Sequence, residues 1–242
     1  MKWFGSERLA PFNAFEWYHI IMVLVYVFGF ISLLIYGSKI TKKKRLSNII
    51  RWVLFVILVC SELSYQAWGS LNNSWNVREY LPFQLCSIAG ILTMIALFTK
   101  KHNLIQIVFF IGVVPSFLAV ITPELYYGFP HFRFWQFFIH HIALSWACIF
   151  LIVTTPLTIS FKDMFQSYLY LLGYAALVGF VINPLFKANF LFLARIPSAN
   201  TPLSLLGDGI WYYINLCSVG FIVFIALYYI HKVFIMKVQS FN

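Results

Sequence analysis

Seven stretches of this sequence are apolar for long enough to cross a lipid bilayer. A helix rises 1.5 Å per residue, so a hydrocarbon core of ~30 Å needs about 20 apolar residues. The expected spans are residues 17–36, 49–70, 83–98, 104–121, 134–154, 165–183 and 210–230. Backbone polar groups in lipid must find partners within their own segment, which favours helices. The sequence therefore predicts an all-α fold in which residues 1–242 form a single domain, a polytopic seven-helix transmembrane bundle.

Composition excludes a soluble protein. Hydrophobic residues make up 62% of the 242 residues, charged residues only 10%, and the mean hydropathy is +0.84. A net charge of +10 is also typical of nucleic-acid binding, but that function needs a basic face on a soluble surface. Here the cations lie in the loops between apolar runs, so we expect no nucleic-acid partner.

The distribution of Lys and Arg predicts the orientation in the membrane. One set of alternate loops holds 11 cations and the other holds 6. The richer set consists of Lys39, Lys42, Lys43, Lys44, Arg45, Arg51, Lys100, Lys101, Lys162, Lys232 and Lys237, and the poorer set of Lys2, Arg8, Arg78, Arg133, Lys187 and Arg195. Cytoplasmic loops carry the excess of positive charge. We therefore expect the N-terminus outside and the C-terminus in the cytoplasm.

The connection at residues 184–209 is long and partly apolar. Residues 190–193 read Phe-Leu-Phe-Leu, and Asn183 and Asn189 are among the residues that interrupt the apolar pattern. Irregular backbone at membrane depth needs protein or a water-filled cavity around it. Two interpretations remain, a re-entrant excursion over an outer cavity and an ordinary exposed loop.

Polar residues within the spans are the first candidates for a site, because they are costly in lipid. Glu62 is the acid within a predicted span, and Gln66 follows one turn later on the same face. The four cysteines all fall in predicted helices, and no Cys/His set has the spacing of zinc ligands. We expect neither a disulfide framework nor a metal or other cofactor.

Cys86 and the pair His140 and His141 are expected at the same depth. Pro82 suits the first position of a helix, which places the Cys86 thiol ~6 Å below the helix start. Free amides and the positive end of the helix dipole favour a thiolate there. From Phe134 to His141 is ~10 Å along a helix that also enters from outside. Only one of the two histidines can face Cys86, and the sequence leaves open which one.

These segments resemble a known family. The segments at residues 81–86 and 131–141, the Asn-rich loop at 183–193, Ser204-Leu205-Leu206 and Trp211-Tyr212-Tyr213 together resemble the YwaF-type bacterial integral membrane proteins. That family is distantly similar to eukaryotic multispanning acyltransferases of ether phospholipids. The resemblance implies Cys86 as nucleophile and His141 as base, with His140 as the alternative, in the plasma membrane of a bacterium. Gln84 stands where many relatives have His.

The function expected from the resemblance is that of an intramembrane acyltransferase or lipid esterase. Its partner would be an outer-leaflet membrane lipid, and Glu62, Gln66, Gln84, Asn183 and Asn189 would bind substrate or support the site. Two other classes remain open. A transporter would use Glu62 and the histidines as a solute or proton path, and a non-catalytic scaffold would need none of these groups.

Overall fold

The computed structural model describes residues 3–7, 11–196 and 202–235, and within them the regular structure is helical with no strand. The α-helices are α1 (Trp17–Lys42), α2 (Lys44–Leu71), α3 (Val77–Tyr80), α4 (Leu85–Thr99), α5 (His102–Ile121), α6 (Phe132–Thr154), α7 (Phe161–Leu177), α8 (Asn183–Phe186) and α9 (Gly209–Ile230). The π-helix η1 (Val178–Ile182) joins α7 to α8, and η4 (His231–Ile235) follows α9. The 3-10 turns η2 (Phe190–Phe192) and η3 (Pro202–Leu205) lie between α8 and α9.

The predicted all-helical, multi-span architecture is confirmed. Six helices are long and apolar enough to cross a membrane, one of them the continuous segment Phe161–Phe186. The third predicted span, residues 83–98, corresponds to α4, a shorter apolar helix of 15 residues. At 1.5 Å per residue α4 is only ~22 Å long. Residues 83 and 84, which the prediction assigned to this span, belong to the turn that precedes α4.

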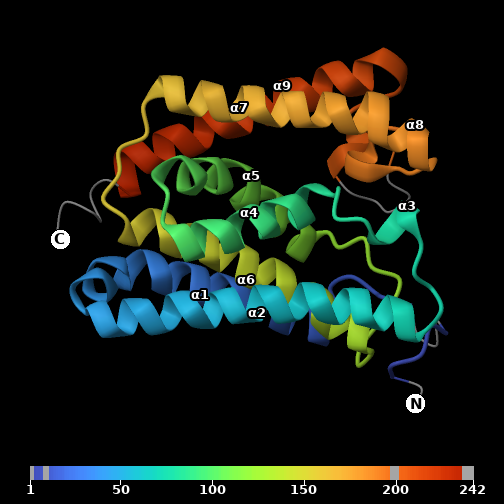
Figure 1. Ribbon diagram of the computed structural model, residues 1–242, viewed down its shortest axis with the longest axis horizontal. Helices are drawn as coiled ribbons and strands as arrows, with labels where there is room; N and C mark the ends of the chain where they lie inside the picture. Colours follow the sequence, from blue (N-terminus) through green and yellow to red (C-terminus); the bar gives the residue numbers. More distant parts are fainter. Residues whose placement is uncertain (1–2, 8–10, 197–201, 236–242) are drawn as a thin grey trace.

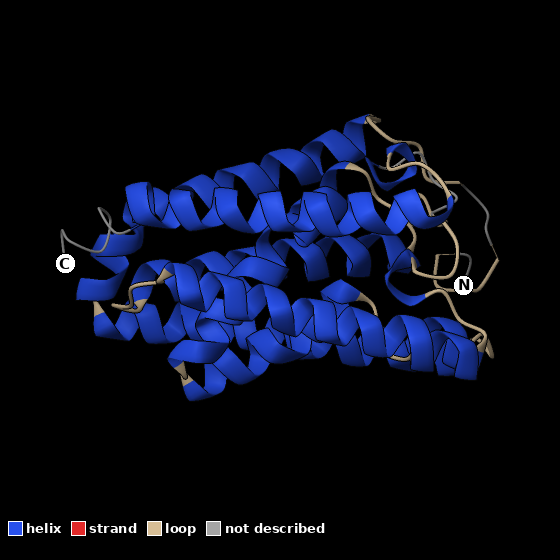
Figure 2. Cartoon of the chain, turned by 90° about the horizontal axis from the view of Figure 1, so that it is seen from above, coloured by secondary structure: helices blue, strands red, loops and turns tan. Residues whose placement is uncertain are grey.

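Helix α6 is the centre of the bundle. It packs against α1, α2, α4 and α5, whereas α7 and α9 pack against each other and meet the rest of the bundle mainly at α5. Figure 1 shows this arrangement, with α7 and α9 as a pair along one side of the molecule. In Figure 2 the long helices run side by side, and most loops gather at the end where the described N-terminal segment lies.

Small residues bring the central helices close together. A Cβ at Gly29 of α1 would lie 2.0 Å from the Trp146 ring of α6, and one at Gly112 of α5 would lie 2.5 Å from the Cys148 sulfur. Lipid provides no hydrophobic force between helices, so such close van der Waals packing is a main source of their association. The outer helices instead expose large apolar side chains, as Phe28 and Phe180 do.

The cations divide between the two ends of the bundle. The α1–α2 junction with Lys43, the α4–α5 turn with Lys100 and Lys101, the start of α7 with Lys162 and the end of α9 before Lys232 lie at one end of the bundle (Figure 1). Helix α3, which contains Arg78, and α8, which precedes Lys187, lie at the other end. Lys2, Arg8 and Lys237 lie outside the described residues. Arg133 differs from the prediction, because it belongs to the first turn of α6 and not to a loop.

The N-terminal segment is tied to the loop-rich end by hydrogen bonds. The carbonyl of Trp3 accepts from the Phe132 amide at 2.8 Å, and that of Phe4 accepts from the Trp68 indole at 2.6 Å. His131, the N-cap of α6, donates from Nε2 to the Gly5 carbonyl at 2.8 Å and accepts at Nδ1 from the Arg133 amide at 3.1 Å. One ring nitrogen of His131 therefore donates and the other accepts, which requires the neutral imidazole.

This arrangement predicts an acid-sensitive contact. Burial lowers the pKa of His131 below its ordinary value of 6.5. The unfolded chain then binds the proton first, so stability is expected to fall as the pH drops from about 6.5 through the lowered folded value. We expect His131→Asn, which keeps an N-cap acceptor but does not titrate, to flatten this dependence. Thermal unfolding in detergent between about pH 5 and about pH 8 measures it, and equal slopes for the two proteins would contradict the prediction.

Candidate functional site

A cavity of about 530 Å³ opens between the α7–α9 pair and the rest of the bundle. This volume lies in the range of small-molecule pockets, ~300–1,000 Å³. Most of its walls are apolar and come from α5, α7 and α9, namely Phe110, Ile111, Val114, Leu118, Leu171, Leu172, Leu216, Val223 and Phe224. Phe110 and Phe224 stack with their ring centroids 4.9 Å apart. Most polar side chains come from α2, α6 and the start of α4, and Glu79 of α3 and Thr122 and Glu124 of the α5–α6 connection also line the cavity.

Helix α6 supplies the polar wall through one continuous face. Arg133, Gln136, Phe137, His140 and His141 all line the cavity. Their spacing of i, i+3, i+4, i+7 and i+8 places them on a single stripe of the helix. Both predicted histidines therefore lie at the cavity.

Cys86 lies at the cavity wall in the first turn of α4. The prediction that Pro82 begins this helix was wrong, because α4 begins at Leu85 with Gln84 as its N-cap. The first amide bonded within the helix is that of Ile88, which donates to the Gln84 carbonyl at 3.0 Å. The amides of Cys86 and Ser87 precede it and have no acceptor within the helix. Cys86 is thus closer to the free helix end than the sequence indicated.

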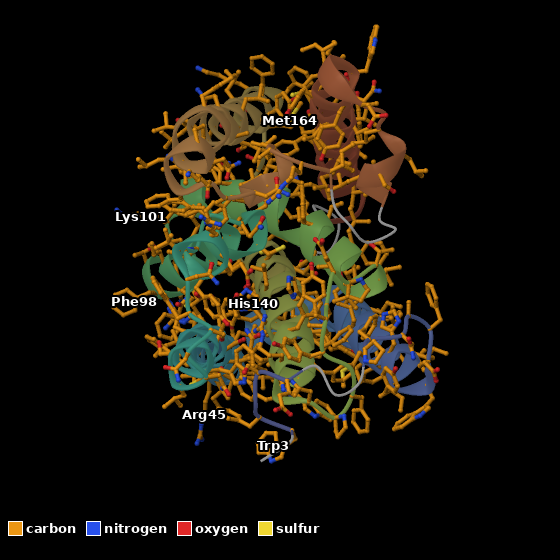
Figure 3. All side chains as sticks on the ribbon, turned by 90° about the vertical axis from the view of Figure 1, so that its right-hand side faces the viewer. Trp3, Arg45, Phe98, Lys101, His140 and Met164 are labelled. Atoms are coloured by element: carbon orange, nitrogen blue, oxygen red, sulfur yellow. The ribbon has the colours of Figure 1, made fainter. Side chains whose placement is uncertain are left out.

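His140 anchors α6 against the same turn of α4. It is buried, and its Cε1 and Nε2 would lie 3.3 and 3.4 Å from a Cβ at Gly90, one turn beyond Cys86. The His140 Nδ1 has no hydrogen-bond partner among the described residues. Figure 3 shows His140 in the interior of the molecule. Because α4 has Gly at position 90, α6 can approach Cys86 at this point.

His141 is held differently. Its Nδ1 donates to the Phe137 carbonyl at 2.7 Å, and its ring lies 4.2 Å from the Phe137 ring. A carbonyl can only accept, so the proton of a neutral ring is on Nδ1 and the lone pair is on Nε2. His141 therefore has the tautomer that a general base needs.

Arg133 occupies the N-terminal end of the α6 stripe, where its guanidinium lies 4.0 Å from the Tyr65 ring and 5.5 Å from the Trp68 ring of α2. It donates to the Gln136 Oε1, and Gln136 in turn donates to Ser61 Oγ at 3.2 Å. These contacts fix the direction of the Arg133 side chain by stacking and hydrogen bonding.

Residues 14–229 match the family model described as the TMEM164 family. The chain belongs to the TMEM164 family. Cys86, His140, His141 and Arg133 all lie within the matched residues. No curated protein and no solved structure matches the sequence. The resemblance to YwaF-type proteins and to ether-phospholipid acyltransferases stays a prediction.

The remaining predicted site residues fall into two groups in this TMEM164-family chain. Glu62 and Gln84 line the cavity together with the His140 ring. Gln66 donates to Glu62 Oε1 at 3.0 Å and to the Tyr80 carbonyl at 2.9 Å, and it accepts from the Trp75 indole at 2.9 Å. It joins α2 to the α3 segment and is not among the residues that line the cavity.

Asn183 and Asn189 shape the long loop. Buried Asn183 donates to the Phe190 carbonyl at 3.0 Å and accepts from the Phe190 amide at 2.8 Å. Asn189 accepts from the Ala194 and Arg195 amides. Gln84 accepts from the Leu191 amide at 2.9 Å, which ties the loop to the start of α4. Residues 191–193 line the cavity, so the loop is packed against it and is not an ordinary exposed connection.

The cavity is also lined by polar residues that were not predicted from the sequence. Arg133 was counted among the loop cations, and Gln136 and Ser87 were not considered. Arg133 and Gln136 could have been found from the helical spacing of positions 133, 136, 137, 140 and 141. Across residues 3–7, 11–196 and 202–235, no three His, Cys, Asp or Glu side chains lie close enough together to hold a metal ion.

The contact between His140 and Gly90 gives a paired prediction. Gly90→Ala puts a methyl group 3.3 Å from the His140 ring, whereas Gly173→Ala in α7 meets nothing within 4 Å. We expect Gly90→Ala to destabilise the protein by about 1 kcal/mol and to lower any activity of the site. Gly173→Ala should leave the unfolding midpoint unchanged or slightly higher. Thermal unfolding in detergent compares the two, and equal midpoints would contradict the packing described for His140.

Proposed function

We propose that this protein is an intramembrane acyltransferase or lipid esterase, with Cys86 as nucleophile and His141 as base. One observation carries the proposal. A thiol and two imidazoles line a single cavity whose other walls are mostly apolar and lie among membrane-spanning helices. Such a cavity admits an acyl chain and leaves its ester bond beside the polar groups.

The contacts favour different roles for the two histidines. His141 carries its proton on Nδ1, so its Nε2 can take the proton of a thiol. His140 packs on Gly90, one turn beyond Cys86, so it positions the helix that carries Cys86. We therefore assign the base to His141, as the family resemblance implies, and a positioning role to His140.

The proposed reaction proceeds through a thioester. His141 Nε2 takes the proton of the Cys86 thiol, and the sulfur attacks the ester carbonyl carbon. The carbon–oxygen bond of the ester breaks, and the leaving alkoxide takes the proton from His141. An acceptor alcohol or water then attacks the thioester, passes its proton to His141, and displaces the thiolate, which is reprotonated from His141. The outcome is acyl transfer with an alcohol and hydrolysis with water.

The oxyanion of each tetrahedral intermediate needs hydrogen-bond donors. The amides of Cys86 and Ser87 at the free start of α4 are suited to this role, since neither has an acceptor within the helix. The side-chain amides of Asn183 and Asn189, the other candidate donors, bind backbone groups of their own loop. We assign the oxyanion to the α4 amides.

The same proposal includes the finer topology. We place seven helices across the plasma membrane of a bacterium, with α4 as the third, the N-terminus outside and the C-terminus in the cytoplasm. The cation-poor end of the bundle holds Cys86 and Arg133, so the site would face the outer leaflet. Membrane lipid is then both solvent and substrate.

Purified full-length protein reconstituted in vesicles tests the proposal. The vesicles contain a phospholipid and a diacylglycerol, each with a labelled acyl chain, together with a long-chain alcohol. Release of labelled fatty acid or labelling of the alcohol, from either lipid, supports the function. If neither product forms although the protein in the vesicles is intact, the proposed function is rejected.

Transport is the second candidate, and the carboxylate of Glu62 at a membrane cavity favours it. It predicts solute or proton flux across liposomes and a larger effect of Glu62→Gln than of Cys86→Ala. The acyl-transfer proposal predicts the reverse order.

A further inference from the structure

We propose that residues 191–193 form a lid over the loop-rich end of the cavity, and that this lid opens to admit a ligand. The three residues line the cavity, and the segment follows α8 at that end of the bundle (Figure 1). The inference concerns access to the cavity and goes beyond the proposed function. It holds for any reaction or transport step that the cavity serves.

The lid is joined to both sides of the cavity by side-chain hydrogen bonds. On one side, the Leu191 amide donates to Gln84 Oε1, at the start of α4, at 2.9 Å. On the other side, the Tyr213 hydroxyl of α9 donates to the Leu193 carbonyl at 2.8 Å. The lid therefore bridges the gap between the α7–α9 pair and the rest of the bundle. A single neutral hydrogen bond contributes little net stability, so both bonds can break reversibly.

The backbone of the closed lid is strained. Leu191 and Phe192 have φ angles of 56° and 55°, in the left-handed region. Bulky residues rarely adopt this conformation, because the Cβ atom comes too close to the carbonyl oxygen. Opening lets both residues return to negative φ, which offsets part of the loss of the two hydrogen bonds. The closed and open states are then close in free energy, as a moving element requires.

The segments on either side of the lid are fixed. Before it, buried Phe190 is held by two hydrogen bonds to the Asn183 side chain. After it, the Asn189 side chain accepts from the Arg195 amide at 2.8 Å and donates to the Arg195 carbonyl at 2.9 Å. These bonds close the segment on itself around the lid. Opening is therefore confined to residues 191–193, and the rest of the loop stays in place.

Gly179 allows the closed lid to pack against the π-helix η1. A Cβ at Gly179 would lie 3.3 Å from Leu193 Cδ1 and 3.7 Å from Leu193 Cβ. The second distance falls within the range of about 3.5–4.5 Å between the Cβ atoms of a disulfide. Replacing Leu193 by cysteine also removes the close contact at Cδ1. The double variant Gly179→Cys/Leu193→Cys can therefore lock the lid in its closed position.

The locked full-length protein in detergent tests the inference. A maleimide with a hexadecyl chain alkylates Cys86, and peptide mapping follows the reaction before and after reduction of the disulfide. We expect the disulfide to slow this alkylation at least about 10-fold, because labelling follows the population of the open state. N-ethylmaleimide reports the reactivity of the thiol, and its rate should change far less. Reduction should restore the hexadecyl rate, and oxidised Leu193→Cys protein should match the unmodified chain.

Tyr213→Phe is expected to shift the lid in the opposite direction. The change removes the hydrogen bond to the Leu193 carbonyl and keeps the aromatic ring. The hexadecyl probe should then alkylate Cys86 about 2- to 10-fold faster, the effect of one neutral hydrogen bond on the open population. Tyr170→Phe is the matched control, since Tyr170 is exposed on α7 and does not line the cavity. Its rate should equal that of the unmodified chain.

Each contrary result overturns the inference. A disulfide that forms and leaves the hexadecyl rate unchanged means that ligands enter by another route. Equal slowing of both maleimides means that the disulfide changes the thiol and not access to it. Failure of the disulfide to form, in a double variant with an unchanged unfolding midpoint, excludes the closed position. If the double variant does not fold, the comparison of Tyr213→Phe with Tyr170→Phe decides, and equal rates reject the lid.

Discussion

Replacing Cys86 by alanine is expected to reduce acyl release from labelled lipid to the level of protein-free vesicles, a loss of at least about 10³-fold. Without the sulfur no thioester can form, and direct attack by water would have to occur in a cavity that is mostly apolar. The protein should still fold, because Cys86 is only partly buried and the change removes a single sulfur atom. The measurement is the initial rate of label release in reconstituted vesicles.

The matched control is Cys60→Ala. Cys60 is a free cysteine on the exposed face of α2 and does not line the cavity. Its replacement should leave the rate unchanged, which separates the loss of the nucleophile from a general effect of removing a thiol. A Cys86→Ala protein with full activity would exclude the thioester route.

The second large effect is expected at His141. His141→Ala removes the Nε2 base, and we expect the turnover rate to fall by about 10²- to 10⁴-fold with a smaller change in the apparent lipid affinity. The rate of alkylation of Cys86 by a lipid-soluble maleimide should fall in parallel, since the thiolate is no longer generated by a neighbouring base. A merely structural His141 would leave the alkylation rate unchanged.

His140 should respond differently, since it acts through its packing against Gly90 of α4. His140→Ala is expected to reduce turnover less than His141→Ala and to lower the unfolding midpoint, because it leaves a cavity beside Gly90. His140→Asn keeps part of the side-chain volume and should recover part of the loss. If His140→Ala proved the more damaging variant for both turnover and Cys86 alkylation, the assignment of the base would pass to His140.

The placement of Cys86 and the two histidines on one cavity could be predicted from depth alone. Both segments enter from the same end, and 1.5 Å per residue placed them at one level. The contacts that distinguish the two histidines could not be predicted from the sequence. They depend on Gly90 for His140 and on the Phe137 carbonyl for His141, and helical periodicity identifies neither partner. The start of α4 was predicted at the wrong residue because Pro82 fits the first position of a helix as well as it fits the turn in which it lies.

Arg133 was missed for an instructive reason. Lys and Arg between apolar runs serve as topology signals, and counting them treats all of them as equivalent. The cation that lines the cavity is set apart by its position on a helix face with Gln136 and His140, and by the aromatic rings of α2 beneath it. The packing of residues 190–193 over the cavity could not be predicted either. It depends on the hydrogen bonds of Asn183 to Phe190 and of Gln84 to Leu191.

The most direct test of the account is intact-mass spectrometry of the full-length protein purified from membranes, before and after neutral hydroxylamine. The account predicts a fraction of molecules heavier by one fatty acyl group, located at Cys86 by peptide mapping, lost on hydroxylamine treatment and absent from Cys86→Ala protein. An adduct at a different residue, or no adduct in active protein under conditions that preserve thioesters, would contradict it.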